Sequence, residues 1–261
     1  TGSAAQTSGT TSGGEGGSGG SGGGGEGGHS CIDTGQRPSA RSEMAGILDP
    51  SRRQLVFFGG DTGFPKQCNP APFAIGETWT YDVACASFTQ VLTPEPPPRA
   101  RSMGAYDAAG DRMIVFGGRY REGSAGAYTV RGDVWALDLA GLTWSQLDTA
   151  PGPSARSNPA GAVDAAANEL VVFGGNTSTS GASFSPQNDV WAFHLETHAW
   201  REVQTTGDAP SERLFHAAAI DAEGRKLFVY GGGGANAFQG PFYGDLFQLD
   251  LATGVWEELS P

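Results

Sequence analysis

A fourfold internal repeat constrains the fold of this 261-residue chain more than any other feature. The stretch GDVWALDLAGLTW at 132–144 returns as NDVWAFHLETHAW at 188–200, which is 56 positions later. The aromatic residue that ends the stretch recurs at the same interval, as Phe88, Trp144, Trp200 and Trp256. The one near its start recurs as Trp79, Trp135, Trp191 and Phe247, each two positions after Glu77, Asp133, Asp189 or Asp245. A period of this length predicts stacked copies of one supersecondary unit.

Each unit is predicted to hold four short strands and no helix. One strand always ends in two glycines: LVFFGG at 55–60, MIVFGG at 113–118, LVVFGG at 170–175 and LFVYGG at 227–232. In the second unit we expect strands over SMGAYDA (102–108), DRMIVF (111–116), VWALDL (134–139) and TWSQL (143–147). No segment keeps a 3.6-residue apolar period, so the fold class is all-β.

Four-stranded sheets of this composition are apolar on both faces, so they must stack against one another. Radial stacking into a β-propeller, with one blade per repeat, satisfies every sheet. At the paired glycines a side chain would strike the neighbouring blade or force a positive φ angle. The tryptophans are expected to lie as large apolar plates between blades.

The glycine pair, the acid-x-Trp motif and the second tryptophan together resemble the kelch repeat. The resemblance covers residues 38–261 and implies a kelch-type β-propeller of four antiparallel blades, at about 38–94, 95–151, 152–208 and 209–261. Kelch propellers usually have five to eight blades and often close by sharing strands between their termini. Here every unit has its own four strands, so we expect a partial or truncated ring, and a closed four-bladed ring is the alternative.

Residues 1–37 form a predicted disordered tether, because glycine and serine dominate them and apolar side chains are scarce. A 28-residue chain of this kind reaches roughly 30 Å. The segment fits either a passive tail or a tether that holds a domain off a surface. The second reading predicts an extracytoplasmic protein, secreted or tethered to the cell surface, as in lipoproteins with a removed signal peptide and a lipid anchor upstream.

The net charge of −12 disfavours nucleic acid as a partner, because binding to it depends on basic side chains that contact phosphates. No apolar run approaches the 18 or so residues that span a bilayer. We therefore predict no nucleic acid partner and no membrane insertion by this segment.

The strand order predicts that the long loops between the second and third strands gather at one end of the propeller. These loops cover 61–76, 119–132, 176–188 and 233–244, and long ordered loops usually have a function. Aromatic and arginine side chains, which anchor interfaces, are frequent in them. The candidate ligand-binding residues are Phe64, Arg119, Tyr120, Arg121, Tyr128, Arg131, Phe184, Phe238, Phe242 and Tyr243. The alternative for any one of them is that it folds its loop back over the blade.

A second candidate group lies at the start of the first strand of each unit, near the central channel. It consists of Arg41, Arg101, Arg156, Arg213 and His216. The kelch resemblance implies that such arginines bind acidic groups of a partner. Bonding to loop carbonyls is the structural alternative. The repeated acids are expected to accept hydrogen bonds from backbone N–H groups of a neighbouring turn.

Catalytic and metal-binding motifs are scarce, so we predict no catalytic residue, no metal site and no cofactor. Copper radical oxidases share the kelch-type fold and need two histidines and two tyrosines at one metal, and no such set stands out among four histidines. A sugar epimerase needs only one or two channel groups, and His216 with Glu212 leaves that reading open.

Three cysteines allow one disulfide. Cys68 lies in the first long loop, and Cys85 lies in a turn at the opposite end of the same sheet. A strand length of about 17–20 Å is too long for a disulfide to span. Cys31 precedes the first strand at the end that carries Cys68. We therefore expect a Cys31–Cys68 bond with Cys85 free, which fits an extracytoplasmic location.

The sequence thus favours an extracytoplasmic kelch-type binding module that recognises a protein or glycan through the long-loop face. The alternative is a carbohydrate-active enzyme, an oxidase or sugar epimerase, with its site at the channel mouth. A purely structural surface module is a third reading.

Overall fold

The computed structural model describes residues 31, 34–63, 74–122, 126–147 and 151–259. The chain divides into two units, Thr1–Cys31 and Ile32–Pro261, and Cys31 is the described residue of the first unit. Across the described ranges all regular elements are β-strands, which confirms the all-β prediction. The same ranges contain no helix with the length and apolar character needed to cross a bilayer.

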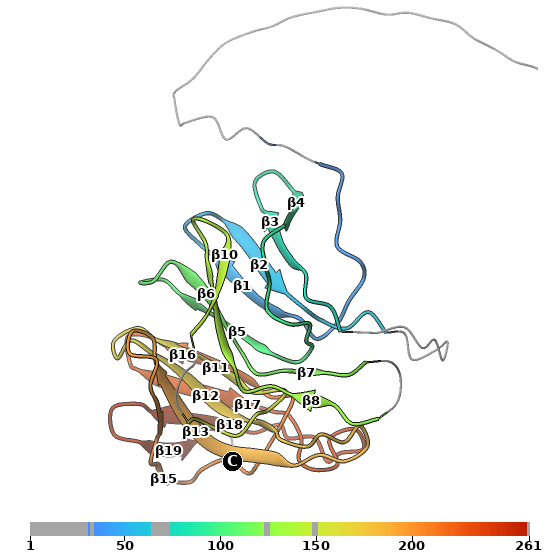
Figure 1. Ribbon diagram of the computed structural model, residues 1–261. Coiled ribbons are helices and arrows are strands. Elements are labelled where there is room, and N and C mark those ends of the chain that lie inside the picture. The colour runs from blue at the N-terminus through green and yellow to red at the C-terminus, as the bar shows by residue number, and fades with distance from the viewer. Residues whose placement is uncertain (1–30, 32–33, 64–73, 123–125, 148–150, 260–261) are drawn as a thin grey trace, which may run out of the picture. The chain divides into compact units, whose positions relative to one another are not determined.

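Four antiparallel four-stranded sheets follow one another along the chain, and we call them blades 1 to 4 (Figure 1). Blade 1 contains β1 (Ala45–Asp49), β2 (Gln54–Phe58), β3 (Thr78–Asp82) and β4 (Ser87–Val91). Blade 2 contains β5 (Met103–Asp107), β6 (Arg112–Phe116), β9 (Val134–Asp138) and β10 (Thr143–Gln146). Blade 3 contains β11 (Ala160–Asp164), β12 (Glu169–Asn176), β13 (Pro186–His194) and β14 (Trp200–Glu202). Blade 4 contains β16 (Ala217–Asp221), β17 (Lys226–Tyr230), β18 (Leu246–Asp250) and β19 (Val255–Glu258).

Two short additions complete the strand inventory. β15 (Thr206–Gly207) joins the sheet of blade 4 by pairing in parallel with β19. β7 (Arg119–Tyr120) and β8 (Thr129–Val130) form a small hairpin inside the long loop of blade 2. Within the four main strands of every blade the spatial order is the order in the chain, so each blade is a simple meander, to which β15 is added at the β19 edge of blade 4.

The blades stack face to face, and their first strands β1, β5, β11 and β16 are successive neighbours. One apolar cluster fills each junction. Val56 and Phe58 of blade 1 pack with Met113 of blade 2, and comparable clusters lie between blades 2 and 3 and between blades 3 and 4. Strands β6 and β12 of the middle blades are therefore covered on both faces.

The predicted aromatic plates lie between blades. The ring of Trp144 in blade 2 lies 5.2 Å from that of Phe58 in blade 1, between centroids. Trp200 lies 5.1 Å from Phe116 in the same way, and Trp256 lies 5.4 Å from Phe173. In each case the tryptophan of the last strand of one blade covers the phenylalanine at the end of the second strand of the blade before it.

The paired glycines are required for both of the predicted reasons. Gly117 has a φ angle of +71°, which favours glycine, and a Cβ atom there would lie 2.5 Å from the backbone oxygen of Arg156 in the next blade. A Cβ atom at Gly59 would likewise lie 2.5 Å from the backbone oxygen of Arg99. The glycines thus let the backbone of the next blade approach closely.

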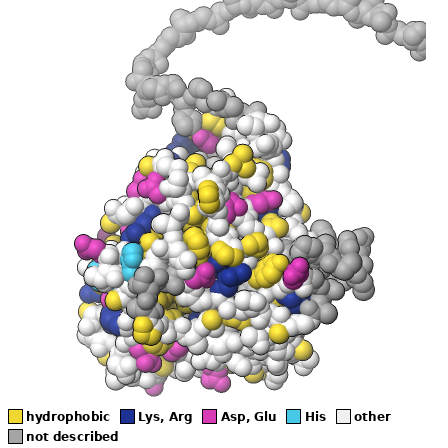
Figure 2. Space-filling model, in the orientation of Figure 1, with side chains coloured by type: hydrophobic (Ala, Val, Ile, Leu, Met, Phe, Trp, Pro, Cys, Tyr) yellow, Lys and Arg dark blue, Asp and Glu magenta, His cyan; other side chains and the backbone are white. Residues whose placement is uncertain are grey.

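The ring of blades is not closed, as expected for a partial propeller. Strand β16 does not pack beside β1 in the way that β1 packs beside β5. The outer faces of the two end blades leave apolar side chains exposed, with Leu48 53% exposed in blade 1 and Tyr230 56% exposed in blade 4. Figure 2 shows hydrophobic side chains gathered across the middle of one face of the molecule, beside basic ones.

The structure contradicts the predicted cysteine pairing. Cys31 and Cys85 are both disulfide-bonded, so Cys85 is not free. A Cys31–Cys68 bond would leave Cys85 without a cysteine partner in a chain with three, so that pairing is wrong; Cys68 itself lies outside the described residues. The prediction assumed that the segment before β1 stays at the long-loop end. Instead this segment runs along the outer face of blade 1, where the Arg37 guanidinium lies 5.6 Å from the ring of Phe88, close to Cys85 in sequence.

Candidate functional site

The long loops and the links that enter each blade share one end of the propeller, as the strand order predicts. In each blade, the residue three positions before the first strand forms a β-bridge with the residue that follows the glycine pair. The bridged pairs are Ser42 with Asp61, Ala100 with Arg119, Ser157 with Asn176 and Leu214 with Gly233. This end therefore carries both groups of candidate residues.

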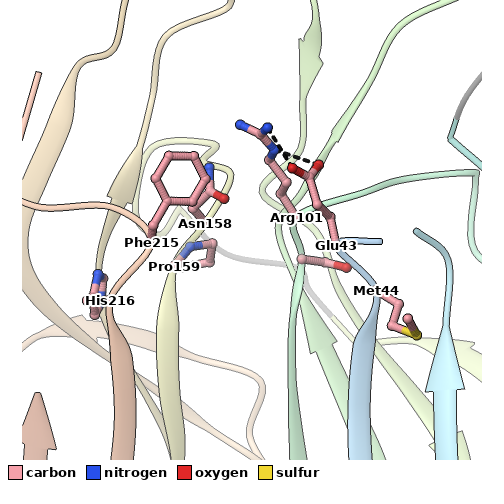
Figure 3. A pocket seen from close by; sticks show the side chains of 8 residues that line it. Glu43, Met44, Arg101, Asn158, Pro159, Phe215 and His216 are labelled. Atoms are coloured by element: carbon pink, nitrogen blue, oxygen red, sulfur yellow. Dashed lines mark hydrogen bonds and ion pairs between the residues drawn. The ribbon is translucent and has the colours of Figure 1, made fainter. Parts of the chain in front are cut away.

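A pocket of about 290 Å³ opens where the four first strands converge at this end, and we call it the mouth pocket (Figure 3). Each blade contributes two consecutive residues to its lining. These are Glu43 and Met44, Arg101 and Ser102, Asn158 and Pro159, and Phe215 and His216. The pocket is thus built from equivalent positions of the repeat that carry different side chains.

The first residue of each pair has a left-handed backbone. The φ angles are 58° at Glu43, 61° at Arg101, 54° at Asn158 and 61° at Phe215. Asparagine tolerates this region, whereas a bulky residue such as phenylalanine rarely adopts it. Backbone hydrogen bonds between blades hold two of these residues in place: Arg101 N donates to Glu43 O, and Asn158 N donates to Arg101 O, both at 2.8 Å. Strained backbone of this kind is concentrated at functional sites.

Arg101 is the central charged group of the mouth pocket. Its Nε and Nη2 atoms donate to the Glu43 carboxylate at 2.6 Å, and its side chain is 9% exposed (Figure 3). Its Nη1 atom is buried and has no hydrogen-bond partner among the described residues. The Nη1 atom of Arg101 is therefore a donor for which the described residues supply no acceptor.

Arg119 lies beside this pair and has no carboxylate partner among the described residues. It is 8% exposed, and its guanidinium carbon lies 3.9 Å from the centre of the Tyr128 ring. Burial, and then the nearby charge of Arg101, lower the pKa of the Arg119 guanidinium below its usual range. The carboxylates of Glu43 and Asp61 act on Arg119 in the opposite direction, and Glu43 is already bonded to Arg101.

An aromatic cluster of Phe184, Phe215 and Phe238 adjoins Arg101. The ring centroids of Phe184 lie 6.2 Å from those of Phe215 and 5.0 Å from those of Phe238. The Arg101 guanidinium lies 5.0 Å from the centre of the Phe215 ring. Phe238 is 63% exposed, so the cluster presents an apolar surface beside the cationic one.

His216 lies deeper than Phe215 and is 8% exposed. Burial, and then the charge of Arg213, lower its pKa to about 4. The ring packs edge-on against Phe173, and neither ring nitrogen makes a hydrogen bond among the described residues. At neutral pH the imidazole is therefore neutral and buried.

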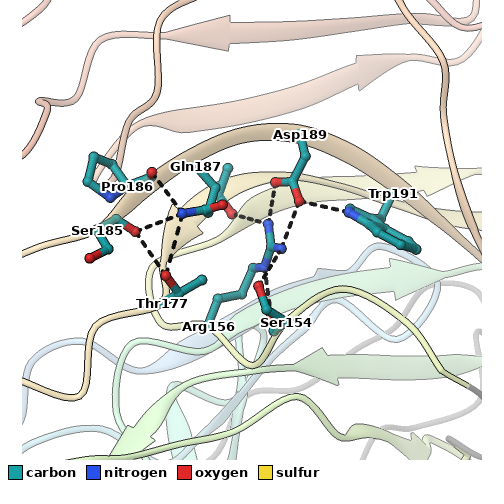
Figure 4. A network of polar contacts seen from close by, with 9 residues as sticks. Ser154, Arg156, Thr177, Ser185, Pro186, Gln187, Asp189 and Trp191 are labelled. Carbon is teal, nitrogen blue, oxygen red and sulfur yellow. Dashed lines mark hydrogen bonds and ion pairs between the residues drawn. The ribbon is translucent and has the colours of Figure 1, made fainter.

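The other predicted channel arginines have a different role, which Figure 4 shows for Arg156. Its Nη1 and Nη2 atoms donate to the Asp189 carboxylate at 2.5 and 2.9 Å, and Nη1 also donates to Gly174 O at 3.0 Å. The indole of Trp191 donates to the same carboxylate at 2.8 Å. Burial alone would raise the pKa of Asp189, but the bonds and charge of Arg156 and the Trp191 bond lower it. We call this arrangement the arginine clamp.

All four blades contain an arginine clamp. The pairs are Arg41 with Glu77, Arg99 with Asp133, Arg156 with Asp189 and Arg213 with Asp245. The arginine side chains are at most 2% exposed. Arg41, Arg156 and Arg213 do not line the mouth pocket, because their guanidinium groups bond to carboxylates and to glycine carbonyls. These bonds agree with the structural alternative for the channel arginines. The acids accept from arginine and indole groups, and not from backbone N–H groups of a neighbouring turn as expected.

Arg101 is not the blade 2 equivalent of these arginines. The clamp arginine of blade 2 is Arg99, and Arg101 lies two positions later, where blade 1 has Glu43 and blade 3 has Asn158. Glu43, Asn158 and Phe215 were missed from the sequence. A constant spacing of 18 residues from each clamp arginine to the glycine that it bonds would have revealed the register.

The remaining predicted loop residues do not join the mouth pocket. The guanidinium carbon of Arg121 lies 4.3 Å from the centre of the Tyr128 ring. The backbone N–H of Tyr128 donates to Thr179 O in the loop of blade 3. Tyr120 pairs within the β7–β8 hairpin, and Arg131 is half-buried near the clamp of blade 2. Phe242 and Tyr243 line a second pocket on blade 4, and Phe64 lies outside the described residues.

Among the described residues, no group of three or more His, Cys, Asp or Glu side chains is placed to hold a metal ion. Glu212 is exposed and does not line the mouth pocket, so it does not form a pair with His216 there. What the geometry offers is a small pocket around the Arg101–Glu43 ion pair, with Arg119 nearby and aromatic side chains beside it.

The arginine clamp should contribute far more to stability than a surface ion pair. Arg156→Met leaves Asp189 with an uncompensated and partly buried charge, which should cost about 3–5 kcal/mol in the free energy of unfolding. Lys226→Met removes the surface Lys226–Asp250 pair and should lower the free energy of unfolding far less, because surface ion pairs are screened by solvent. Urea denaturation followed by tryptophan fluorescence measures both, and equal losses would contradict the assigned role.

The stability of the protein should fall as the pH is lowered from about 6.5 to about 4. The folded state disfavours protonation of buried His216, whose pKa is about 4, while the unfolded chain takes up a proton at its ordinary value. The loss should be at most roughly 3 kcal/mol. His216→Phe should remove this dependence, and His194→Gln, at a partly exposed histidine, should retain it. Urea denaturation across this pH range tests the assignment, which fails if the two variants behave alike.

Comparison with known proteins agrees with this architecture. The family model described as the Attractin/LZTR1 β-propeller matches residues 55–261. Acyl-CoA-binding domain-containing protein 4 of Arabidopsis thaliana is 30% identical over 230 residues, covering 85% of this chain and 31% of that protein. Kelch domain-containing protein 2 of Bos taurus is 28% identical over 245 residues, covering 86% of this chain and 57% of that protein.

A third relative, the Rab9 effector protein with kelch motifs of Homo sapiens, is 33% identical over 123 residues, which cover 47% of this chain and 30% of that protein. The matches thus span between about a third and somewhat more than half of these relatives. The four blades, their glycine pairs and their aromatic plates are the features that a kelch repeat implies, and the family match extends over most of them. The chain belongs to the kelch-type β-propeller family.

Proposed function

We propose that this chain is a protein-binding module whose mouth pocket receives an acidic group of the partner. The observation that carries the proposal is the buried Nη1 atom of Arg101, which has no hydrogen-bond partner among the described residues, next to Arg119, which forms no ion pair with a described carboxylate. An unpaired buried charge or donor is costly, and a carboxylate from a partner would supply what is missing.

The surroundings of the pocket favour a protein partner. The cluster of Phe184, Phe215 and Phe238 offers exposed aromatic area immediately beside the arginines. Aromatic and arginine side chains together form the usual energetic centre of protein interfaces. A peptide with an acidic residue next to an apolar one would match both halves of the site. A glycan is the competing ligand, because aromatic faces also stack on sugars.

We also propose that the module works outside the cytoplasm. The disulfide-bonded state of Cys31 and Cys85 supports an oxidising compartment. The glycine-rich N-terminal segment is consistent with a domain held off a surface. Labelling of free thiols in protein taken directly from its host tests this, because a cytoplasmic protein would react at all three cysteines.

Selection from a random peptide library provides the test of the binding proposal. Peptides enriched on the wild-type protein should contain Asp, Glu or a free terminal carboxylate. Their affinity should fall about tenfold or more with Arg101→Gln and with Arg119→Gln, since a charged hydrogen bond contributes about 1.5–3 kcal/mol. Arg53→Gln, an exposed arginine in the β1–β2 turn at the opposite end, is the matched control.

Several results would contradict the proposal. They are the absence of any selected peptide, selected peptides without acidic groups, and affinities that neither Arg101→Gln nor Arg119→Gln changes. A glycan array probed with the same three variants tests the competing ligand class. Binding to a glycan that is lost with Arg101→Gln would show that the ligand of the mouth pocket is a sugar and not a protein.

A further inference from the structure

Successive blades are joined by one backbone hydrogen bond that repeats along the chain. The second glycine of each pair donates its N–H to the clamp arginine of the next blade. Gly60 N donates to Arg99 O at 2.9 Å, Gly118 N to Arg156 O at 2.9 Å and Gly175 N to Arg213 O at 3.0 Å. This bond, together with the aromatic plate that covers the preceding blade, defines how one blade receives the next.

Blade 4 presents the receiving half of this junction, and none of the described residues occupies it. Gly232, the equivalent glycine, has no acceptor for its N–H among the described residues. Tyr230 in blade 4 is the repeat equivalent of Phe173 in blade 3. Phe173 is fully buried under Trp256 of the next blade, whereas Tyr230 is 56% exposed. A pocket of about 300 Å³, lined by Tyr230, Gly231 and Gly232 among others, marks the place that the next blade would fill.

Blade 1 presents the inserting half. The backbone oxygen of its clamp arginine, Arg41, accepts no hydrogen bond among the described residues. Leu55 is 41% exposed and Val83 is 42% exposed, whereas the equivalent residues of blade 2, Met113 and Leu139, are at most 3% exposed. The segment before β1 lies along part of this outer face, where Arg37 contacts Phe88. Leu55 and Val83 remain exposed beside it, and no blade of the described chain lies against them.

The charges of the two open faces are also complementary. At the junction of blades 3 and 4, Asp164 of the β11–β12 turn pairs with Arg225 of blade 4 at 2.6 Å. The repeat equivalent of Asp164 in blade 4 is Asp221. In blade 1 the position of Arg225 is occupied by Arg53, with the same left-handed backbone, φ 51° against 48°. Asp221 and Arg53 are both exposed.

We propose that this chain associates head to tail with a second copy of itself, with the outer face of blade 4 on one copy against the outer face of blade 1 on the other. The contact reproduces an internal junction. The N–H of Gly232 on one copy donates to the Arg41 oxygen of the other, and Asp221 pairs with Arg53. The apolar outer face of blade 1 covers Tyr230. Both halves belong to one chain, and the open ring keeps them from meeting within it. Such a heterologous contact continues into a ring or an open chain of copies, and two copies would supply eight blades.

Sedimentation velocity and light scattering on the full chain over a range of concentrations test the proposal. The wild-type mass should rise from 26.9 kDa to twice that value or more. Tyr230→Glu blocks the blade 4 face and Leu55→Glu blocks the blade 1 face, so each variant alone should stay monomeric. Phe238→Glu, which removes an exposed aromatic side chain at the mouth pocket, should associate like the wild type.

The decisive measurement is an equimolar mixture of the Tyr230→Glu and Leu55→Glu variants. Each retains the face that the other has lost, so the mixture should form a complex of two chains and no larger species. Formation of that complex also proves that both variants are folded. A monomeric wild type, a monomeric mixture, or association that only one of the two substitutions abolishes would overturn the proposal. None of these results depends on what binds at the mouth pocket.

Discussion

The arginine clamp is the interaction on which the rest of this structure depends. In each blade one buried guanidinium joins three pieces of backbone: the end of the second strand through a glycine carbonyl, the start of the third strand through its acid, and the link that enters the blade. Burying these charges is costly. In blades 2 to 4 the cost is offset by bidentate arginine–carboxylate bonds, and in blades 1 to 3 the indole of the third strand adds another donor. The same set of atoms recurs in blades 2 and 3, and blade 4 replaces the indole by Phe247, whose ring lies 5.4 Å from the Arg213 guanidinium.

The clamp also determines where the variable residues of the mouth pocket lie. Each mouth residue follows its clamp arginine by two positions, and the residue between them is bridged to the long loop. Its left-handed backbone turns its side chain towards the other blades, which is why Glu43, Arg101 and Phe215 meet although they are more than 50 residues apart. The repeated residues therefore build the blades and their junctions. The position two residues after each clamp arginine differs between blades and provides the side chains of the mouth pocket.

The sequence was sufficient for the fold because a repeat tests itself. Glycine pairs, acids and aromatic plates at a constant interval specify strands, turns and blade contacts together, and a wrong assignment in one unit would disagree with three others. The site was harder, because its residues are the ones that the repeat does not constrain. Arg101 was aligned with Arg41 when Arg99 is the true equivalent, and this shift of two positions hid Glu43, Asn158 and Phe215. The cysteine pairing failed for a related reason, since the segment before β1 belongs to no repeat and its path along blade 1 leaves no periodic signal.

The geometry of the mouth pocket depends on the angle between neighbouring blades. The ion pair of Arg101 with Glu43 crosses the junction of blades 1 and 2, while the contact of Arg101 with Phe215 reaches from blade 2 to blade 4. Both contacts exist only while every junction between them keeps its geometry, and the junctions are held by clamp arginines whose carbonyls receive the glycine N–H bonds. A change at one clamp should therefore move mouth residues of blades that it does not touch. Since the Nη1 atom of Arg101 is positioned by the ion pair with Glu43, the proposed binding of an acidic group at the mouth pocket depends on the packing between blades as well as on the residues that line the pocket.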